Sequence, residues 1–417
     1  MAARKYDYLF MGAGIMGSSG SWALATKLRS RGSSAKIGVI DIDLSGEHSS
    51  TLKNAGGVRA TWRNRANIEL CKYSINFYEK ISKKIQFRQL GYYWLHNDQS
   101  LAEIERNMPL YAEYDIDIKI FDTNQINRFL PFIDNLEGVS GLSISKNAGL
   151  IDHYSLREYY RSEGKKLDVD YLDRLYIKDI HREGKRIKSL TALNLKDVSN
   201  ADILKDYLVN ENVNRPCEIL TFDCEYLINT TGAWSPVLSR LYGFKDESVK
   251  PRRRQMLVIN NQEVDLTSYG MIIDTSNVYF HKEGNNILAG YSNMDEPYGY
   301  NFDVNFDSLE ENSPFIKYIW EPLFFRMSRF ERVKLIRGWA GIYAETPDRS
   351  GYIGRVEGTE NVFECVAHTG RGLMISYGAG QALADLAVDG NFRKDLQSAS
   401  AFSRRRPDGN LYEELHL

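Results

Sequence analysis

The first forty residues of the chain carry the pattern that most restricts its fold. An apolar run starting at residue 7 leads directly into the motif Gly12-x-Gly14-x-x-Gly17, and a second apolar run, residues 36–41, ends on Asp41. About 30 residues separate the first glycine from this acidic residue, which is the usual length of a βαβ unit. In such a unit the glycines allow a tight turn, close approach of the backbone to phosphates, and close packing of the helix on the sheet.

The chemistry available at this turn favours a dinucleotide. A helix over residues 18–31, beginning near Ile15, would direct free N–H groups and the positive end of its dipole at a pyrophosphate. Asp41 can accept hydrogen bonds from ribose hydroxyls. Three glycines can also form a turn and nothing more, but the strands on both sides and the terminal acid support the dinucleotide interpretation.

Size and composition exclude several other classes of protein. At 417 residues the chain is too long for one ordinary core, so two joined domains are expected. A net charge of −2 offers no basic field for nucleic acid, and no apolar run reaches the roughly 20 residues of a membrane span. Peripheral contact with a membrane stays open. The first strand begins too early to leave room for a signal peptide, so a cytoplasmic location is expected. The four cysteines have no metal-like spacing, so no metal site is expected.

The order of the predicted elements favours a protein of the α/β class with mixed α+β character. Helices are expected at residues 66–81 and 154–166, a β-rich stretch covers residues 251–291, and a strand followed by a helix returns at residues 362–389. We therefore expect a Rossmann-like nucleotide-binding domain built from discontinuous segments, with an antiparallel β-sheet substrate domain inserted into it.

The nucleotide-binding domain is assigned to residues 1–85, 145–245 and 335–395, and the substrate domain to residues 86–144 and 246–334. Three polar stretches are expected on the surface. They are the tail at residues 396–417, an Asn-rich insertion at residues 194–214, and a basic run at residues 252–254. One member of the basic run can instead face the flavin side.

Five segments, in order along the chain, resemble those of the FAD-dependent D-amino-acid oxidase (DAO) superfamily, which contains sarcosine oxidase, glycine oxidase and dimethylglycine dehydrogenase. Residues 49–59 resemble the loop that passes near the flavin ring, and residues 227–235 (LINTTGAWS) resemble a strand whose glycine approaches the cofactor. Residues 274–291 are similar to a hairpin of the substrate domain. Residues 339–354 resemble the block WAGxxxxTxDxxPxIG, and residues 367–372 (AHTGRG) resemble the glycine turn that opens a helix beneath the flavin.

The resemblance implies FAD rather than NAD, because both ends of the chain return to the nucleotide. The glycine turn near residue 370 adds a second helix N-terminus, which in this family faces the flavin pyrimidine, where charge accumulates on reduction. Gly341 and Lys53-Asn54 stand where some relatives have a tethering cysteine or histidine, so FAD is expected to bind non-covalently. The residues expected to contact FAD are Gly12, Gly14, Ile15, Met16, Gly17, Asp41, Ser49, Ser50, Asn54, Ala55, Gly56, Gly57, Thr231, Gly232, Trp234, Gly341, Gly370, Arg371, Gly372, Leu373 and Met374.

The chemistry that the resemblance implies is removal of hydride from a carbon that bears nitrogen. Sarcosine oxidases have an oxygen-activating lysine just before a Gly-Tyr pair, whereas this chain has Leu288 and Ala289 before Gly290-Tyr291. A dehydrogenase that passes electrons to a quinone or another flavoprotein is therefore favoured over an oxidase, with oxygen as the remaining acceptor. The expected substrate is a small molecule that carries a carboxylate.

Three residues are the candidate catalytic groups. Met374 stands where the family has a substrate-binding lysine, so the substrate carboxylate needs another cation. Arg59 can bind it bidentately, with Arg337 and Arg371 as alternatives, although each arginine can equally serve in a structural ion pair. Tyr343 is expected to present its hydroxyl to the pocket. Arg59, Tyr343 and Arg371 are therefore the residues expected to act on the substrate.

The leading hypothesis is an FAD-dependent oxidoreductase that oxidises a C–N bond of a small amino acid or secondary amine, such as proline, sarcosine or a D-amino acid. Two alternatives stay open. Related folds use FAD to oxidise a 2-hydroxy acid or glycerol phosphate. Other members, which resemble this chain at residues 279–284, are flavoprotein assembly factors without turnover.

Overall fold

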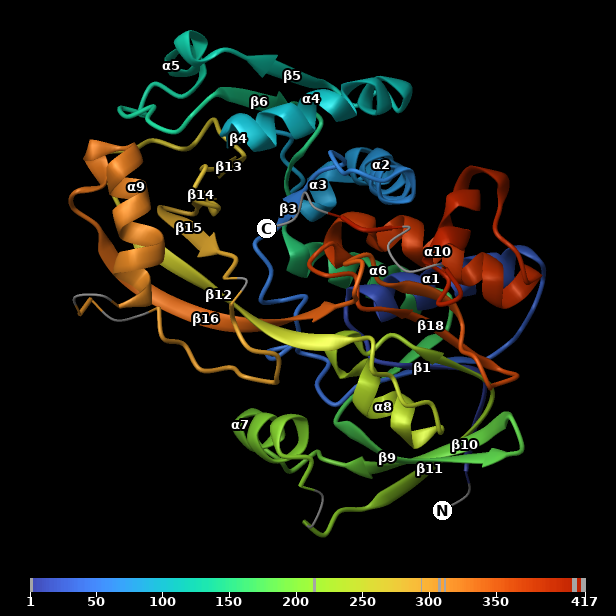
Figure 1. Ribbon diagram of the computed structural model, residues 1–417. Helices are drawn as coiled ribbons and strands as arrows, with labels where there is room; N and C mark the ends of the chain where they lie inside the picture. The colour runs from blue at the N-terminus through green and yellow to red at the C-terminus, as the bar shows by residue number, and fades with distance from the viewer. Residues whose placement is uncertain are drawn as a thin grey trace.

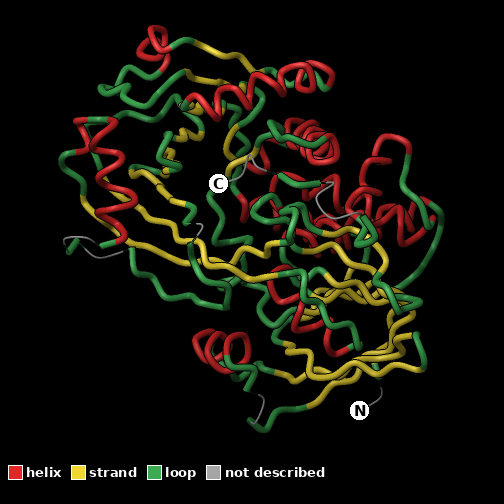
Figure 2. Tube along the Cα trace, in the orientation of Figure 1, coloured by secondary structure: helices red, strands yellow, loops and turns green. Residues whose placement is uncertain are grey.

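The structure, a computed structural model, describes residues 3–212, 215–293, 295–306, 309–310, 313–406 and 411–413. Within these residues the strands form two eight-stranded sheets and a short two-stranded one, with helices around them (Figures 1 and 2). The predicted mixed α/β class, with a second sheet inserted into a nucleotide-binding unit, is confirmed.

The first sheet carries the glycine motif. Its strand order is β17-β18-β11-β1-β2-β8, and β10 and β9 extend it as an antiparallel pair beside β11. The strands from β18 to β8 are parallel, and β17 is antiparallel to β18. Both faces of a parallel sheet are covered, which explains why every residue of β2 is buried. The strands are β1 (Arg4–Met11), β2 (Ile37–Ile40), β8 (Val169–Leu172), β9 (Leu175–Glu183), β10 (Arg186–Asn194), β11 (Ile219–Asn229), β17 (Tyr352–Arg355) and β18 (Val362–Val366).

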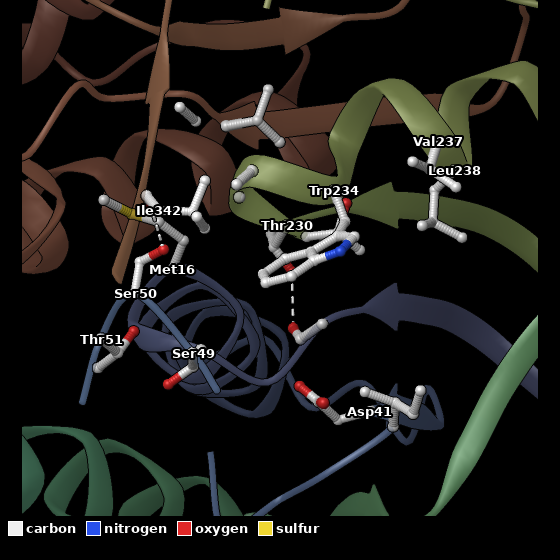
Figure 3. Close-up of a pocket in the computed structure, with 18 of the residues that line it drawn as sticks. Met16, Asp41, Ser49, Ser50, Thr51, Thr230, Trp234, Val237, Leu238 and Ile342 are labelled. Atoms are coloured by element: carbon white, nitrogen blue, oxygen red, sulfur yellow. Dashed lines mark hydrogen bonds between the residues drawn. The ribbon is translucent and has the colours of Figure 1, made fainter. Parts of the chain in front are cut away.

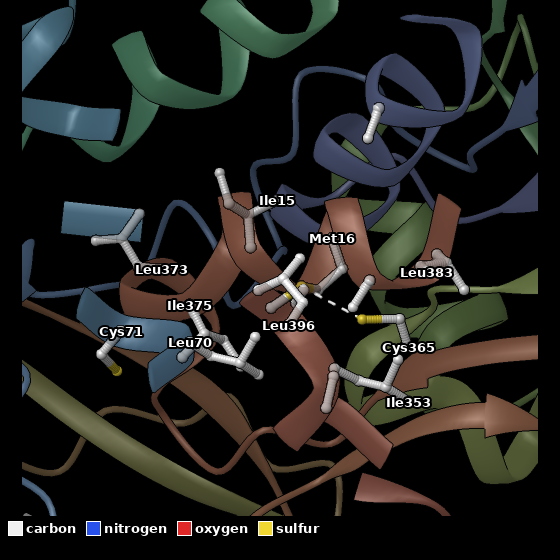
Figure 4. Close-up of a cluster of buried hydrophobic side chains, with 14 of the residues drawn as sticks. Ile15, Met16, Leu70, Cys71, Ile353, Cys365, Leu373, Ile375, Leu383 and Leu396 are labelled. Carbon is white, nitrogen blue, oxygen red and sulfur yellow. Dashed lines mark hydrogen bonds between the residues drawn. The ribbon is translucent and has the colours of Figure 1, made fainter. Parts of the chain in front are cut away.

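Long helices cover one face of this sheet. They are α1 (Ile15–Ser30), α6 (His153–Lys165) and α10 (Gly372–Asp389), with α2 (Arg65–Lys80) packed on α10. A Cβ at Gly380 would lie 2.2 Å from the Ser19 hydroxyl oxygen, so glycine is what lets α1 and α10 approach each other. The main apolar core lies between these helices and the sheet and includes Met16, Leu373 and Leu383 (Figure 4). This packing fixes the start of α1 relative to the start of α10.

The second sheet has the strand order β16-β12-β15-β14-β13-β4-β6-β5. Its neighbours are antiparallel except β13 and β4, which run parallel. β16 pairs with β12 along nearly its whole length and is the edge of this sheet, although the expected division assigned residues 335–395 to the nucleotide-binding domain. The strands are β4 (Tyr92–His96), β5 (Ile118–Phe121), β6 (Gly141–Ser145), β12 (Lys250–Asn260), β13 (Met271–Ile273), β14 (Val278–Glu283), β15 (Asn286–Tyr291) and β16 (Lys334–Glu345).

Shorter elements connect and cover the two sheets. Apolar residues of α9 (Glu321–Arg326) and of the π-helical turn η4 (Ile316–Trp320) pack against the second sheet. No helix in the described part of the chain is long and apolar enough to cross a membrane. The remaining elements are β3 (Gly57–Val58), α3 (Ser82–Ile85), α4 (Asp98–Glu113), η1 (Thr123–Gln125), α5 (Ile126–Phe129), β7 (Gly149–Leu150), α7 (Asn200–Asp202), η2 (Ile203–Val209), η3 (Gly232–Trp234), α8 (Ser235–Leu241), η5 (Ser328–Phe330) and η6 (Lys394–Phe402).

The insertion at residues 194–214 was expected on the surface, but its described part is packed against the protein. Leu195, Val198, Ile203 and Tyr207 form a buried cluster. These apolar residues recur at close to helical spacing, so one face is buried while polar residues occupy the other. The expectation overlooked this face. Residues 213–214 lie outside the described residues.

The tail at residues 396–417 was also expected on the surface, but several of its described residues are buried. Phe402 joins the main core, and Glu413 is fully buried. Arg404 pairs with Glu364 at 2.5 Å and with Asp246 at 2.7 Å. Polarity was misleading here because buried carboxylates neutralise the arginine. Residues 407–410 and 414–417 of this tail lie outside the described residues.

The basic run at residues 252–254 is buried rather than solvated. Arg253 pairs with Glu296 at 2.7 Å, and Arg254 pairs with Glu345 at 2.8 Å. The expectation was wrong because β12 is an inner strand, with β16 on one side and β15 on the other. Inner strands keep charged side chains only when carboxylates from neighbouring elements compensate them.

Candidate active site

A cavity of about 300 Å³ opens where parallel strands of the first sheet end (Figure 3). Gly12 follows β1, Asp41 follows β2, and Thr230 follows β11, and all three line the cavity. The carboxyl ends of parallel strands lie at one edge of a sheet, so these loops meet there. Ile15 and Gly372, the first residues of α1 and α10, line the same cavity. The cavity is therefore bordered by two helix N-termini.

Two glycines of the motif are required by the shape of the turn. Gly12 has φ = +92°, and a Cβ there would lie 2.9 Å from the carbonyl oxygen of Thr230. A Cβ at Gly17 would lie 1.9 Å from the carbonyl oxygen of Gly12. Gly17 thus lets α1 pack on the turn and does not itself line the cavity, whereas Gly12 and Gly14 do.

Asp41 holds the turn from the end of β2. Its carboxylate accepts hydrogen bonds from the backbone N–H of Ala13 at 2.5 Å and of Asp43 at 2.9 Å. Loss of contact with water raises the pKa of this carboxyl, while the two amide donors and Arg161 oppose the rise. Asp41 lines the cavity, which is where a residue that binds ribose hydroxyls must lie. Its binding of ribose stays a prediction.

The far wall of the cavity comes from the insertion, which sequence reasoning missed. Tyr207, Leu208 and Glu211 line the cavity. The indole N–H of Trp234 donates to the carbonyl oxygen of Leu208 at 3.2 Å, and Glu211 pairs with Arg240 at 2.9 Å. No recognisable motif marks these residues, and the only available signal was the helical spacing of apolar residues within a polar stretch.

A smaller cavity of about 80 Å³ adjoins the first one. The two cavities share residues of the 50–54 loop, of β16 and of the 369–370 turn. Gly370 has φ = +79°, and a Cβ there would lie 2.6 Å from the Tyr343 ring. The smaller cavity brings together Arg59, Tyr343 and Arg371, although Arg59 lies in the first hundred residues and the other two lie beyond residue 340. Arg337, the third arginine considered, is exposed and lines neither cavity.

Arg371 is a buried cation at the edge of the smaller cavity. It is fully buried, and none of its Nε, Nη1 and Nη2 atoms has a hydrogen-bond partner among the described residues. Its guanidinium lies 4.9 Å from the ring centroid of Trp62. Burial lowers the pKa of Arg371 to about 10, so the group remains charged at neutral pH. A buried cation of this kind favours an anion beside it.

Arg59 is held more firmly than Arg371. Its Nη1 donates to the backbone carbonyl of Thr61, and its guanidinium lies 3.6 Å from the ring centroid of Trp62 and 5.1 Å from that of Trp94. Burial lowers the pKa of Arg59, and Tyr92 and Glu413 oppose this effect. Arg59 therefore contributes positive charge to the cavity from a fixed position.

Phenol groups form much of the remaining wall of the smaller cavity. Tyr92, Tyr279 and Tyr343 line it, and burial raises the pKa of all three, so they are neutral hydrogen-bonding groups at neutral pH. Arg254 also lines the cavity, with its guanidinium 5.1 Å from the Tyr343 ring centroid. The sequence favoured a solvated basic run and left open that one of its arginines faces the site, and Arg254 is the member that lines the cavity.

The residues expected to contact FAD gather around these two cavities. All of them line one cavity or the other except Gly17 and Gly56. Gly56 has φ = +74°, and a Cβ there would lie 2.7 Å from the carbonyl oxygen of Ile151, so it shapes the loop from behind. The individual contacts with FAD stay predictions.

Comparison with known proteins identifies the family. The model of the FAD-dependent oxidoreductase family, DAO, matches residues 7–386. The chain belongs to this FAD-dependent oxidoreductase family. It is 28% identical over 428 residues to FAD-dependent oxidoreductase domain-containing protein 1 of Xenopus laevis, a match that covers 96% of this chain and 82% of that protein. It is 22% identical over 447 residues to hydrogen cyanide synthase subunit HcnC of Pseudomonas aeruginosa, with 94% and 95% of the two chains covered.

Solved flavoenzyme structures share the fold. L-proline dehydrogenase from P. horikoshii superposes with a TM-score of 0.79 at 20% identity, over 96% of this chain and 97% of that one. Glycine oxidase from Bacillus cereus gives a TM-score of 0.72 at 18% identity, over 96% and 99% of the two chains. At these identities the likeness shows the common architecture.

The residues of the larger cavity fit FAD. The close backbone approach at Gly12 leaves the turn free of side chains where a pyrophosphate would lie, and the helix beginning at Ile15 supplies N–H donors. The helix beginning at Gly372 directs a second positive dipole end at the cavity, close to the region that the smaller cavity shares. FAD bound along this path would place its flavin ring toward the buried cations of the smaller cavity.

Proposed function

We propose that this protein is an FAD-dependent dehydrogenase that oxidises the C–N bond of a small amino acid or secondary amine carrying a carboxylate. The observation that carries the proposal is the fully buried guanidinium of Arg371, which has no hydrogen-bond partner among the described residues and lines the smaller cavity. A carboxylate placed against it would form charge-assisted, bidentate hydrogen bonds.

The walls of the smaller cavity suit a small substrate with an apolar body. Met256, Met271 and Met374 line it together with Trp62, and the cavity volume is about 80 Å³. These side chains exclude water, which strengthens the attraction between Arg371 and a carboxylate. Tyr343 can donate a hydrogen bond to the same carboxylate or to the nitrogen. Bound FAD would supply the acceptor of the electron pair, at its N5 atom.

The described lining of the smaller cavity offers no carboxylate or imidazole base. Among the described residues that line the smaller cavity there is no aspartate, glutamate or histidine. The amine must therefore reach the cavity in its neutral form, with its proton lost to water. We expect the rate of flavin reduction to rise with pH until the substrate amine is fully deprotonated.

Two apolar residues of the second sheet favour an electron acceptor other than oxygen. Leu288 and Ala289, which occupy the positions of the oxidase lysine and its neighbour, are buried apolar residues of β15. Lys53 does line the smaller cavity, but it is only half-buried. A quinone or a second flavoprotein is therefore the proposed electron acceptor. Separately, a cytoplasmic location of the protein stays a prediction.

Non-covalent binding of FAD is part of the proposal. At Gly341 a Cβ would lie 2.7 Å from the Lys53 Cβ, so the position of a tethering cysteine is closed to any side chain. Acid precipitation of the purified protein should release yellow FAD into the supernatant. Yellow colour that stays with the precipitate would contradict non-covalent binding.

Anaerobic reduction of the flavin tests the proposed reaction. A panel of amino acids and secondary amines should bleach the flavin absorbance, and Arg371→Gln should weaken substrate binding at least about 30-fold, from the loss of about 2 kcal/mol. Arg337→Gln, which removes an exposed arginine that lines neither cavity, is the matched control and should leave binding unchanged.

Two other outcomes would overturn the proposal. The fold is also shared with L-α-glycerophosphate oxidase of Mycoplasma pneumoniae, at a TM-score of 0.68 and 13% identity, over 92% and 95% of the two chains. Bleaching by hydroxy acids or glycerol phosphate alone would therefore assign the protein to that chemistry. Flavin that stays oxidised with every compound, in a protein that co-purifies with a partner, would indicate an assembly role instead.

A further inference from the structure

Arg161 is a buried arginine of α6 that contacts the glycine turn from behind. Its Nη2 donates to the carbonyl oxygen of Ala13 at 2.5 Å, and its Nε donates to the hydroxyl oxygen of Ser18 at 3.2 Å. Its Nη1 donates to the carbonyl oxygen of Leu44 at 2.7 Å, in the loop that follows β2. One guanidinium therefore connects α6 to the turn, to α1 and to this loop.

Ion pairing does not account for this set of contacts. Glu158 lies 3.0 Å from Arg161 Nη1 and 3.0 Å from Arg157 Nε, so two arginines share one carboxylate. The Glu158 side chain is 38% exposed, and water weakens its attraction for both. The contacts with Ala13, Ser18 and Leu44 all go to uncharged oxygens. Because a guanidinium holds its donors in a rigid planar fork, these three contacts fix its position.

The carbonyl oxygen of Ala13 is held by two donors. Besides Arg161, the hydroxyl of Ser18 donates to it at 2.9 Å. The peptide group between Ala13 and Gly14 is trans and planar, so the Gly14 N–H points in the opposite direction to this carbonyl. Gly14 lines the larger cavity, whereas Ala13, Ser18 and Arg161 line neither cavity. The contacts behind the turn thus direct the Gly14 N–H toward the larger cavity.

The N–H groups on either side of Gly14 are already bonded within the protein. Their acceptors are the Ile40 carbonyl for Gly12, the Asp41 carboxylate for Ala13 and the Thr51 hydroxyl for Ile15. The Gly14 N–H donates to no atom of the residues that the structure describes. Within residues 12–15, it is therefore the amide that remains available to a phosphate oxygen.

We propose that Arg161 is a positioning residue for the cofactor, which holds the Ala13 carbonyl so that the Gly14 N–H is aimed at the pyrophosphate of FAD. Arg161 lies behind the turn and does not itself contact FAD. An amide that is fixed before the phosphate arrives loses little freedom on binding, so its hydrogen bond contributes more to affinity. The proposal concerns the cofactor of the family and does not depend on the substrate.

Two measurements on the holoenzyme test the proposal. Flavin fluorescence after dilution gives the dissociation constant of FAD, and phosphorus NMR of the bound FAD reports the surroundings of its pyrophosphate. Arg161→Met should weaken FAD binding at least about tenfold and shift the pyrophosphate resonances. Arg161→Lys keeps the positive charge but replaces the fork by a single ammonium, and it should still weaken FAD binding at least about fivefold.

Arg29→Met is the matched control. Arg29 also donates to three backbone carbonyls, but it lies near the end of α1 and lines neither cavity. These carbonyls belong to Ser33, Ala35 and Leu167. Loss of the contacts should lower the Tm and leave both the FAD affinity and the pyrophosphate resonances unchanged. The control therefore separates the loss of a structural arginine from the loss of a directed amide.

Three results would overturn the proposal. They are FAD affinity within about twofold of wild type in Arg161→Met, unchanged pyrophosphate resonances in that variant, and wild-type affinity in Arg161→Lys, which would show that charge alone suffices. Ser18→Ala, which removes the second donor to the Ala13 carbonyl, decides the matter if neither Arg161 variant folds. It should weaken FAD binding about threefold and shift the same resonances, and a wild-type spectrum in Ser18→Ala would equally refute the role of the turn contacts.

These outcomes are independent of the proposed function, because no measurement uses a substrate. If amines bleach the flavin and the Arg161 variants bind FAD as the wild type does, the role of Arg161 alone is wrong. If no amine bleaches the flavin but FAD binding weakens as expected, the assigned reaction alone is wrong.

Discussion

Replacement of Arg371 by methionine is predicted to stabilise the folded protein and at the same time to abolish carboxylate binding. Arg371 is fully buried, and its guanidinium nitrogens have no hydrogen-bond partner among the described residues. Burial lowers its pKa from the ordinary value of an arginine to about 10. Because one pKa unit corresponds to about 1.4 kcal/mol, the charged group destabilises the folded state by about 3 kcal/mol. This destabilisation is present at every pH below about 10, where the folded protein keeps the group protonated.

Part of that gain is offset in the variant. Methionine fills much of the same volume but loses the contact of the guanidinium with Trp62, which is worth about 1 kcal/mol. We therefore expect a net stabilisation of about 2 kcal/mol, or a rise in Tm of about 2 °C for a chain of 417 residues.

Thermal and urea unfolding of the FAD-loaded protein provide the assay. Arg337→Met, at an exposed arginine on Trp339, is the matched control and should change stability by less than about 0.5 kcal/mol. Acetate should raise the Tm of the wild-type protein and not that of Arg371→Met, because a ligand stabilises only the state that binds it. Destabilisation of Arg371→Met by more than about 1 kcal/mol would refute the reasoning, since the guanidinium would then be compensated within the folded protein.

Three further predictions concern other parts of the molecule. Gly17→Ala should weaken FAD binding at least tenfold, measured by flavin absorbance after gel filtration, because the new Cβ would lie 1.9 Å from the Gly12 carbonyl oxygen. The control is Gly354→Ala, where the nearest atom to the new Cβ is 3.8 Å away. Full retention of FAD in Gly17→Ala would contradict the turn geometry. Burial lowers the pKa of His96 to about 4, so the unfolded chain binds more protons between about pH 4 and 6.5, and stability should fall as the pH drops through that range. His96→Gln should reduce this fall in urea unfolding at pH 7 and pH 5, and equal slopes in the two proteins would count against it. Tyr343→Phe should raise the KM of a carboxylate substrate about 3- to 10-fold while FAD stays bound, and an unchanged KM would exclude the Tyr343 hydroxyl from substrate binding.

The nucleotide half of the site was predictable because its requirements are local. Gly12 and Gly17 are fixed by the distance between a strand, a turn and the helix that follows, and these elements are contiguous in sequence. The same holds for Asp41, which bonds to Ala13 across a single βαβ unit. Periodicity also placed α2 and α6 to within one or two residues. These features depend on neighbouring residues, so a single sequence contains the information.

The substrate half was predictable only as a set of candidates. Residue type alone does not distinguish the three candidate arginines, whereas packing does. Arg337 is exposed, and Arg59 donates a hydrogen bond to the Thr61 carbonyl oxygen. Arg371 is buried and has no hydrogen-bond partner among the described residues. Arg254 was misjudged because the position of β12 inside the second sheet depends on pairing with distant strands. Burial of this kind has no local signal.

The sequence by itself determined that this chain contains a dinucleotide turn and two kinds of sheet, because glycine spacing and apolar periodicity act over a few residues. Only the tertiary structure decided which charged groups border the smaller cavity. Arg59 and Arg371 both lie beside the Trp62 ring, although they come from opposite ends of the chain. Electrostatic interactions depend on distance and burial rather than on sequence order, so this arrangement of charged groups became apparent only once the chain was folded.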